Sequence, residues 1–175
     1  VFSFNKIHGI DAYLSPEMKS TGEAIGYDNK LNRALYKALQ ASGMHVQNYG
    51  TVFVTLADKD KEEALPLIAR FYNLGFNIQA TKGTAKFLKE HNIRTHVLGK
   101  ISEGSQEIPE ALRQGYIAYV INTRDIGSMG QLSDGNKIRR LATENNVTMF
   151  TALDTVKVLL DVLEETTLSI STIDA

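Results

Sequence analysis

Hydrophobic and polar positions follow two different periodicities along most of the chain. From Gly50 onward, short runs rich in apolar and β-branched residues predict strands, at residues 51–56, 76–80, 94–99, 116–122 and 147–151. Each run is followed by a segment with helical spacing of its apolar residues, which predicts helices over 59–75, 84–92, 108–114, 134–145 and 153–165. Because alternating strands and helices build parallel sheets, the pattern predicts an α/β fold with a five-stranded parallel, Rossmann-like sheet flanked by helices.

Residues 1–49 do not show this alternation of strand and helix patterns. Residues 1–27 contain several glycines and a proline without a sustained period, whereas residues 28–42 predict one amphipathic helix. We therefore expect two parts. Residues 1–49 would be a short α-helical and irregular tail of a preceding domain with its linker, and residues 50–175 a complete α/β domain. Since the chain starts at Val1 within sequence of folded character, we expect it to be a piece of a longer protein.

Composition restricts the class of partner. The 175 residues carry a net charge of −1 and contain no cysteine. No basic excess is present to neutralise nucleic-acid phosphates, and no apolar run reaches the roughly 20 residues of a membrane-spanning helix. We expect neither a nucleic-acid nor a membrane partner but a small molecule. The absence of cysteines excludes disulfides and thiolate metal sites and, without a secretory leader, favours a cytoplasmic protein.

The turn Thr81-Lys82-Gly83-Thr84 lies between the second predicted strand and its helix. In an open parallel sheet, ligands bind at the carboxyl ends of the strands, where helix N-termini present free amides. Gly83 allows close approach of a ligand, and the two hydroxyls can donate to phosphate or carboxylate oxygens. The alternative is that Thr84 only caps the following helix.

Other strand ends contribute polar residues to the same predicted edge. Lys100 follows the third strand and Thr151 ends the fifth, while the fourth ends in Asn122, Thr123, Arg124 and Asp125. Lys61, near the first strand–helix junction, is either a further cation of this edge or a solvated surface lysine. Cations with threonine and asparagine donors, and no paired acid and base, predict an anion-binding pocket rather than a catalytic one.

Catalytic and metal sites have little support. The four histidines have no metal-ligand spacing, and no nucleophile elbow, Walker A loop or dinucleotide fingerprint occurs. We expect Arg139 and Arg140 to lie on an exposed helix face, Asp134 to be a helix cap, and Glu164 and Glu165 to be solvated. We therefore predict no catalytic residue and no metal ligand.

Several motifs resemble one known family. "SPEMKSTGEAIG" (15–26) resembles a marker at the end of the second ATP-grasp half of the carbamoyl phosphate synthetase large subunit. "GFNIQATKGTAKFL" (75–88), "GKISEG" (99–104), "YVINT" (119–123) and "IRRLA" (138–142) resemble the C-terminal regulatory domain of that subunit, which has the methylglyoxal synthase-like fold. The resemblance covers nearly the whole chain, and the motifs occur in the family's order.

The resemblance implies an allosteric domain that binds a phosphorylated nucleotide of the UMP, IMP or PRPP class. It places the effector phosphate at Thr81, Thr84, Lys100 and Lys61, with Lys82, Gly83, Asn122, Thr123 and Thr151 lining the pocket. No cofactor is expected in this part. The parent enzyme would use ATP with Mg²⁺ or Mn²⁺ to make carbamoyl phosphate from bicarbonate and glutamine-derived ammonia, for pyrimidine and arginine synthesis. Its remaining large subunit and the glutaminase small subunit would be the protein partners.

One departure and two alternatives accompany this interpretation. Phe150 stands where some relatives carry an acidic residue associated with ornithine, so we expect no ornithine response. A methylglyoxal synthase-like lyase would need a Gly-Gly-Asp-Gln-Gln segment where "GKISEGSQEI" (99–108) stands. Asp134 does match a family aspartate, but one carboxylate without that base cannot carry out the proton abstraction. The other alternative is a structural domain that binds nothing, suited to an arginine-pathway isozyme.

Overall fold

The computed structural model describes most of the α/β part of the chain. It covers residues 46–123 and 129–173 continuously, with side chains described for 46–123 and 134–166, and before them residues 2–3, 12–13, 23–24, 34, 37 and 39–41. Arg124 and Asp125, and most of the motif at residues 15–26, lie outside the described residues.

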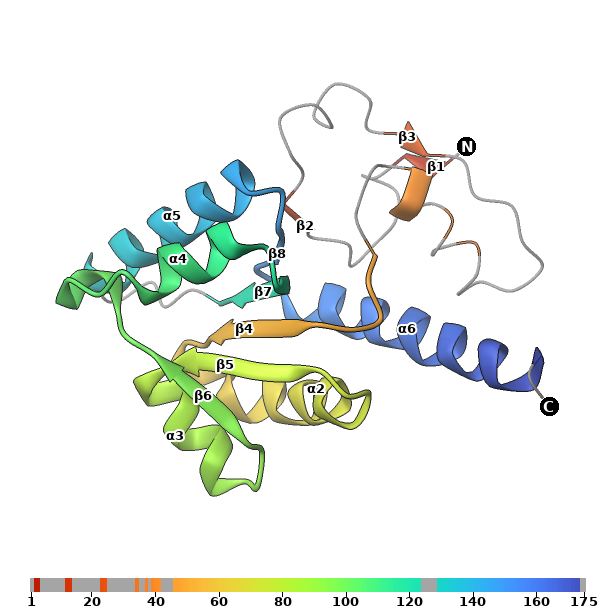
Figure 1. Ribbon diagram of the computed structural model, residues 1–175, viewed down its shortest axis with the longest axis horizontal. Helices are drawn as coiled ribbons and strands as arrows, with labels where there is room; N and C mark the ends of the chain where they lie inside the picture. Colours follow the sequence, from red (N-terminus) through yellow and green to blue (C-terminus); the bar gives the residue numbers. More distant parts are fainter. Residues whose placement is uncertain are drawn as a thin grey trace.

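A six-stranded sheet in the order β2-β8-β7-β4-β5-β6 forms the centre of the molecule (Figure 1). Five of its strands are parallel: β4 (Thr51–Thr55), β5 (Asn77–Thr81), β6 (Thr95–Leu98), β7 (Ile117–Asn122) and β8 (Thr148–Phe150). The short β2 (Ala12–Tyr13) pairs antiparallel with β8 at the edge. The predicted five-stranded parallel sheet is confirmed.

The five parallel strands end along one row. Thr55 pairs with Asn122 and Thr81 with Leu98, while Phe150 pairs with Ile121, the neighbour of Asn122. The residues that follow the strands therefore all lie at one edge of the sheet. Chain order also reverses in the middle, because β4 pairs with β5 on one side and with β7 on the other. Such a switch point is where open α/β sheets bind ligands.

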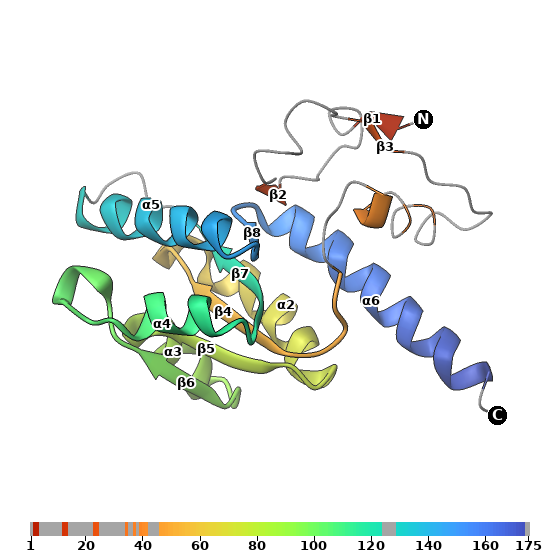
Figure 2. The same ribbon diagram turned by 45° about the horizontal axis from the view of Figure 1, so that its top comes forward.

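Helices cover both faces of the sheet (Figure 2). The helices α2 (Lys61–Asn73), α3 (Lys82–Glu90) and α6 (Leu153–Ile173) pack on one face, and α4 (Glu107–Gln114) and α5 (Met129–Glu144) on the other. Side chains of β4 alternate between the two cores: Val52 and Val54 join the first, and Phe53 joins the second. Strand β7 is buried along its whole length, as a strand covered on both faces must be.

Two short 3₁₀ turns complete this part of the fold. The turn η3 (Asp58–Asp60) follows β4, and η4 (Ile101–Glu103) follows β6. Both therefore lie at the edge where the strands end. The predicted helix stops are confirmed, because Gly75 and Gly115 both have positive φ, the conformation that ends helices and favours glycine.

The N-terminal residues that the structure describes contact the α/β part. Besides the pairing of β2 with β8, Tyr119 on β7 holds the predicted linker, since its hydroxyl donates to the Gln47 carbonyl (2.6 Å) and accepts from the Gln47 amide (2.7 Å). Strands β1 (Phe2–Ser3) and β3 (Glu23–Ala24) pair with each other. The proposed boundary between residues 49 and 50 stays a prediction.

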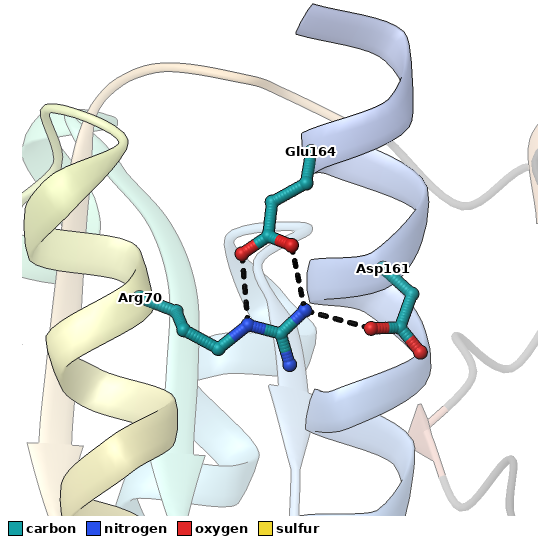
Figure 3. Close-up of polar contacts among 3 residues, drawn as sticks. All are labelled: Arg70, Asp161 and Glu164. Carbon is teal, nitrogen blue, oxygen red and sulfur yellow. Dashed lines mark hydrogen bonds and ion pairs between the residues drawn. The ribbon is translucent and has the colours of Figure 1, made fainter. Parts of the chain in front are cut away.

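Helices α2 and α6 are joined by an ion-pair group that the sequence did not predict. Figure 3 shows the Arg70 guanidinium on α2 bound to Glu164 through Nε (2.8 Å) and Nη2 (2.9 Å), and to Asp161 through Nη2 (2.7 Å). The expectation that Glu164 is merely solvated is wrong. Helix α6 also extends well past the predicted end at residue 165. In the part of the chain that the structure describes, no helix is long and apolar enough to cross a membrane.

Candidate anion-binding site

The turn between β5 and α3 brings its two threonines to the end of β4. Thr81 is the residue before α3, and its hydroxyl oxygen lies 3.5 Å from that of Thr55. Thr84 lies inside the first turn of α3, and its buried hydroxyl accepts a hydrogen bond from the Leu56 amide (3.1 Å). The idea that Thr84 caps the helix is wrong. Both threonines instead connect α3 to the central strand.

Lys61 is directed at this turn rather than at solvent. Its side chain is only 18% exposed, and its ammonium lies 4.0 Å from the position that a Cβ on Gly83 would occupy. The ammonium also pairs with the exposed carboxylate of Asp58 at 2.6 Å. This hydrogen bond and charge hold the pKa of Asp58 below its usual value. Of the two interpretations of Lys61, the solvated surface lysine is wrong.

We call Thr55, Lys61, Thr81, Gly83 and Thr84 the turn site. They come from the ends of β4 and β5 and the starts of α2 and α3. Hydroxyls, an ammonium and a glycine that admits close approach are suited to a small oxyanion. Gly83 is exposed, and so is the neighbouring Lys82. Thr55 was missed by the sequence analysis, because the first strand was predicted to run to residue 56, whereas β4 ends at Thr55.

Lys100 lies on the neighbouring strand end. It follows β6, whose last residue Leu98 pairs with Thr81, and its side chain is half-buried. The 3₁₀ turn η4 begins directly after Lys100. The structure thus places Lys100 at the predicted edge and next to the strand that carries Thr81.

Asn122 and Thr123, at the end of β7, are more buried than residues that line an open ligand pocket need to be. The Thr123 hydroxyl accepts from the Ala57 amide (2.8 Å), and the Asn122 side-chain amide donates to the Gly135 carbonyl (3.5 Å). Both residues are buried and bonded to neighbouring segments. They fix the loops at the switch point, and Thr123 also borders a cavity.

This cavity lies at the ends of β7 and β8 and has a volume of about 600 Å³, within the usual range for small-ligand sites. Its lining includes two of the predicted residues, Thr123 and Thr151. The others are Lys59, Asp60, Glu63, Arg139, Ala152, Leu153 and Asp154. Both cations and carboxylates line it, so its charge is mixed.

Arg139 and Asp134 differ from their predicted roles. Arg139 is half-buried and lines the cavity, so the expectation of an exposed helix face is wrong for this residue. Arg140 is exposed as expected and pairs with Glu144 at 3.7 Å. Asp134 does not cap α5, which begins at Met129. Its carboxylate instead accepts hydrogen bonds from Ser102.

Comparison with known families identifies the domain type. Residues 63–151, more than half of the chain, match the profile described as the MGS-like domain. The match begins in α2 and ends at Thr151, so it contains the predicted site residues except Lys61. Domains of this kind occur in carbamoyl phosphate synthetase large subunits and in methylglyoxal synthase.

Proposed function

The chain belongs to the family of MGS-like domains, and on that premise we propose that it is the allosteric domain of a carbamoyl phosphate synthetase large subunit, which binds a phosphorylated nucleotide. The observation that carries the proposal is the position of Lys61. A mostly buried lysine side chain whose ammonium lies next to Gly83, in the turn that follows Thr81, is suited to an anion that binds the turn.

The physical chemistry of the turn site favours phosphate. Backbone amides in the first turn of α3 are not used by intrahelical bonds, and the helix dipole adds positive potential there. The exposed Gly83 leaves this end of the helix accessible to a bulky tetrahedral group. Lys100, at the end of the adjacent strand β6, would supply a second cation. The nucleoside would then extend along the edge toward Asn122 and Thr123.

The role of the parent protein is inferred from the motif at residues 15–26. Its resemblance to the end of an ATP-grasp half supports a parent that makes carbamoyl phosphate from bicarbonate, ammonia and ATP, together with a glutaminase subunit. In such an enzyme, nucleotide binding to the present domain would change the activity of the ATP-dependent sites. UMP, IMP and PRPP are the effector candidates, because all three carry a phosphate for the turn site.

The test is calorimetric titration of the chain with UMP, IMP and PRPP, together with thermal melting. We expect at least one of them to bind and to raise the melting temperature, since a ligand at about 100 times its Kd adds roughly 2.7 kcal/mol of stability. Lys61→Met and Lys100→Ala should each weaken that binding about tenfold to a hundredfold through loss of a charge-assisted hydrogen bond. Lys86→Met is the matched control, because Lys86 is exposed on α3. Absence of binding by all three compounds would refute the proposal and favour a purely structural domain.

A lyase activity is the alternative that a single observation favours. Asp134, which matches a family aspartate, has one buried carboxylate oxygen without a hydrogen-bond partner among the described residues. The chain should nevertheless form no methylglyoxal from dihydroxyacetone phosphate, because the base expected after β6 is replaced by the Lys100 segment. Turnover abolished by Asp134→Asn would overturn our proposal.

A further inference from the structure

The loop that carries Lys100 is closed by its own hydrogen bonds. The Lys100 carbonyl accepts from the Ser105 amide (3.2 Å), and the Gly99 amide donates to the Glu107 carboxylate (2.5 Å). A Cβ at Gly99 would lie 2.7 Å from the Cβ of Ser105, closer than two such atoms can approach, so a larger residue would displace Ser105. The backbone on both sides of Lys100 is therefore held within residues 99–107.

A second carboxylate attaches this loop to the rest of the domain. The amide and the hydroxyl of Ser102 both donate to the same oxygen of Asp134, at 3.2 and 2.8 Å. Ser102 lies two residues after Lys100, whereas Asp134 is on α5. Hydrogen bonds to an ionised acceptor are stronger than those between neutral groups. This clasp, the bonds between Ser102 and Asp134, is the polar attachment of the loop to a long helix, beside the packing of Ile101 against the second core.

We infer that Asp134 is a positioning residue for anion binding, which acts through Ser102 to hold Lys100 at the edge of the turn site. The inference rests on the proposed function. A lysine side chain has four rotatable bonds, so its ammonium can be directed at a bound anion only if the backbone beneath it is fixed. Ordering a mobile loop at the moment of binding would reduce the affinity.

The direction in which the anion affinity changes distinguishes a positioning role of Asp134 from a purely electrostatic one. Removal of a carboxylate near an anion site reduces repulsion and should strengthen anion binding. Loss of the clasp should weaken it. Ser102→Ala removes the hydroxyl half of the clasp without any change of charge, and Ser102→Thr retains a hydroxyl. Glu103→Gln is the matched charge control, because Glu103 is an exposed carboxylate on the same loop.

The experiment is calorimetric titration of these variants with UMP and with inorganic phosphate. Ser102→Ala should weaken binding about three- to tenfold, the effect of one hydrogen bond. Ser102→Thr should restore binding, and Glu103→Gln should not weaken it. In a Lys100→Ala background the further loss from Ser102→Ala should fall below about twofold, because the clasp then has no cation to position. Unchanged affinity in Ser102→Ala, or an equal loss without Lys100, would overturn the inference.

Amide hydrogen exchange tests the clasp without a ligand. In Asp134→Ala the Ser102 amide should exchange about tenfold faster, since its acceptor is gone, while the melting temperature changes little. Unchanged exchange at Ser102 would refute the clasp itself. If the unsubstituted chain binds neither UMP nor inorganic phosphate, the proposed function fails and the positioning role fails with it. If the unsubstituted chain binds but exchange at Ser102 is unchanged in Asp134→Ala, only the positioning role is lost.

Discussion

Replacement of Glu164 by glutamine tests the connection between α2 and α6. In the folded chain Glu164 accepts two hydrogen bonds from Arg70, at 2.8 and 2.9 Å, and Arg70 also binds Asp161. The Arg70 side chain is 25% exposed and that of Glu164 40% exposed, so solvent screens the pair in part. Exposed ion pairs contribute about 0.2–1 kcal/mol, and the two-point geometry raises our expectation for Glu164→Gln to a loss of about 1–1.5 kcal/mol. For a domain of this size that corresponds to a fall in melting temperature of about 3–5 °C.

The pH dependence of the stability lost in Glu164→Gln tests whether the charged pair is its origin. The hydrogen bond from Arg70, followed by its charge, lowers the pKa of Glu164 in the folded state. A lowered folded pKa gives stability that is fully present above the unfolded pKa, about 4.3, and is lost as the pH falls through the folded value. The difference between the parent chain and Glu164→Gln should therefore be complete at pH 7 and should shrink from about pH 5 downward.

Urea unfolding at pH 7, 5 and 4 measures this difference. Glu90→Gln, the same change at an exposed position of α3, is the control and should have little effect at any of these pH values. Arg70→Met should cost at least as much as Glu164→Gln, and the double variant should show less than the sum of the two losses. Equal stability of Glu164→Gln and the parent chain at pH 7 would refute the reasoning. A difference that stays constant as the pH falls would show that packing, and not the charged pair, is responsible.

Three further changes have defined outcomes. Asp58→Asn should strengthen phosphate binding roughly two- to fivefold in calorimetry, because the ammonium of Lys61 then has no competing carboxylate, and weaker binding would contradict this arrangement. Thr84→Val keeps the shape of the side chain but leaves the Leu56 amide unbonded, so urea unfolding should show a loss of about 1–2 kcal/mol. Tyr119→Phe should cost a similar amount, about 1–2 kcal/mol, because two hydrogen bonds to the linker backbone are lost, and an unchanged unfolding midpoint would argue against that anchor.

The α/β fold could be predicted from the sequence because its signals are local. Strand β7 is apolar from Ile117 to Ile121 before it ends in Asn122, and all its positions are buried. Gly75 and Gly115 mark helix ends through their own positive φ. Such preferences depend on the nearest residues along the chain, so a one-dimensional pattern contains them. Because parallel strands end at one edge, the sequence alone placed Thr81, Lys100 and Thr151 at that edge, where the strand pairing puts them.

Local signals also produced the errors. Asp134 follows Ser133 and precedes a helical pattern, so it has the sequence appearance of a cap, yet α5 begins at Met129. The alternative interpretation of Thr84 as a cap had the same basis, and its hydroxyl accepts a hydrogen bond from the Leu56 amide instead. In both cases the polar side chain could have capped its own helix, but it forms its hydrogen bond with a different segment. A rule based on neighbouring residues cannot anticipate such a long-range partner.

The positions of charged side chains were decided by the tertiary structure alone. Arg70 and Glu164 are 94 residues apart in sequence, and Lys61 could equally have extended into solvent. A charge on a helix surface has no partner specified by periodicity, because its neighbours come from whichever element packs beside it. The sequence by itself determined the strands, the helices and the edge at which polar residues gather. Packing of α2 against α6, and of α3 against the end of β4, determined which of those residues meet, because long-range contacts depend on how complete faces fit together.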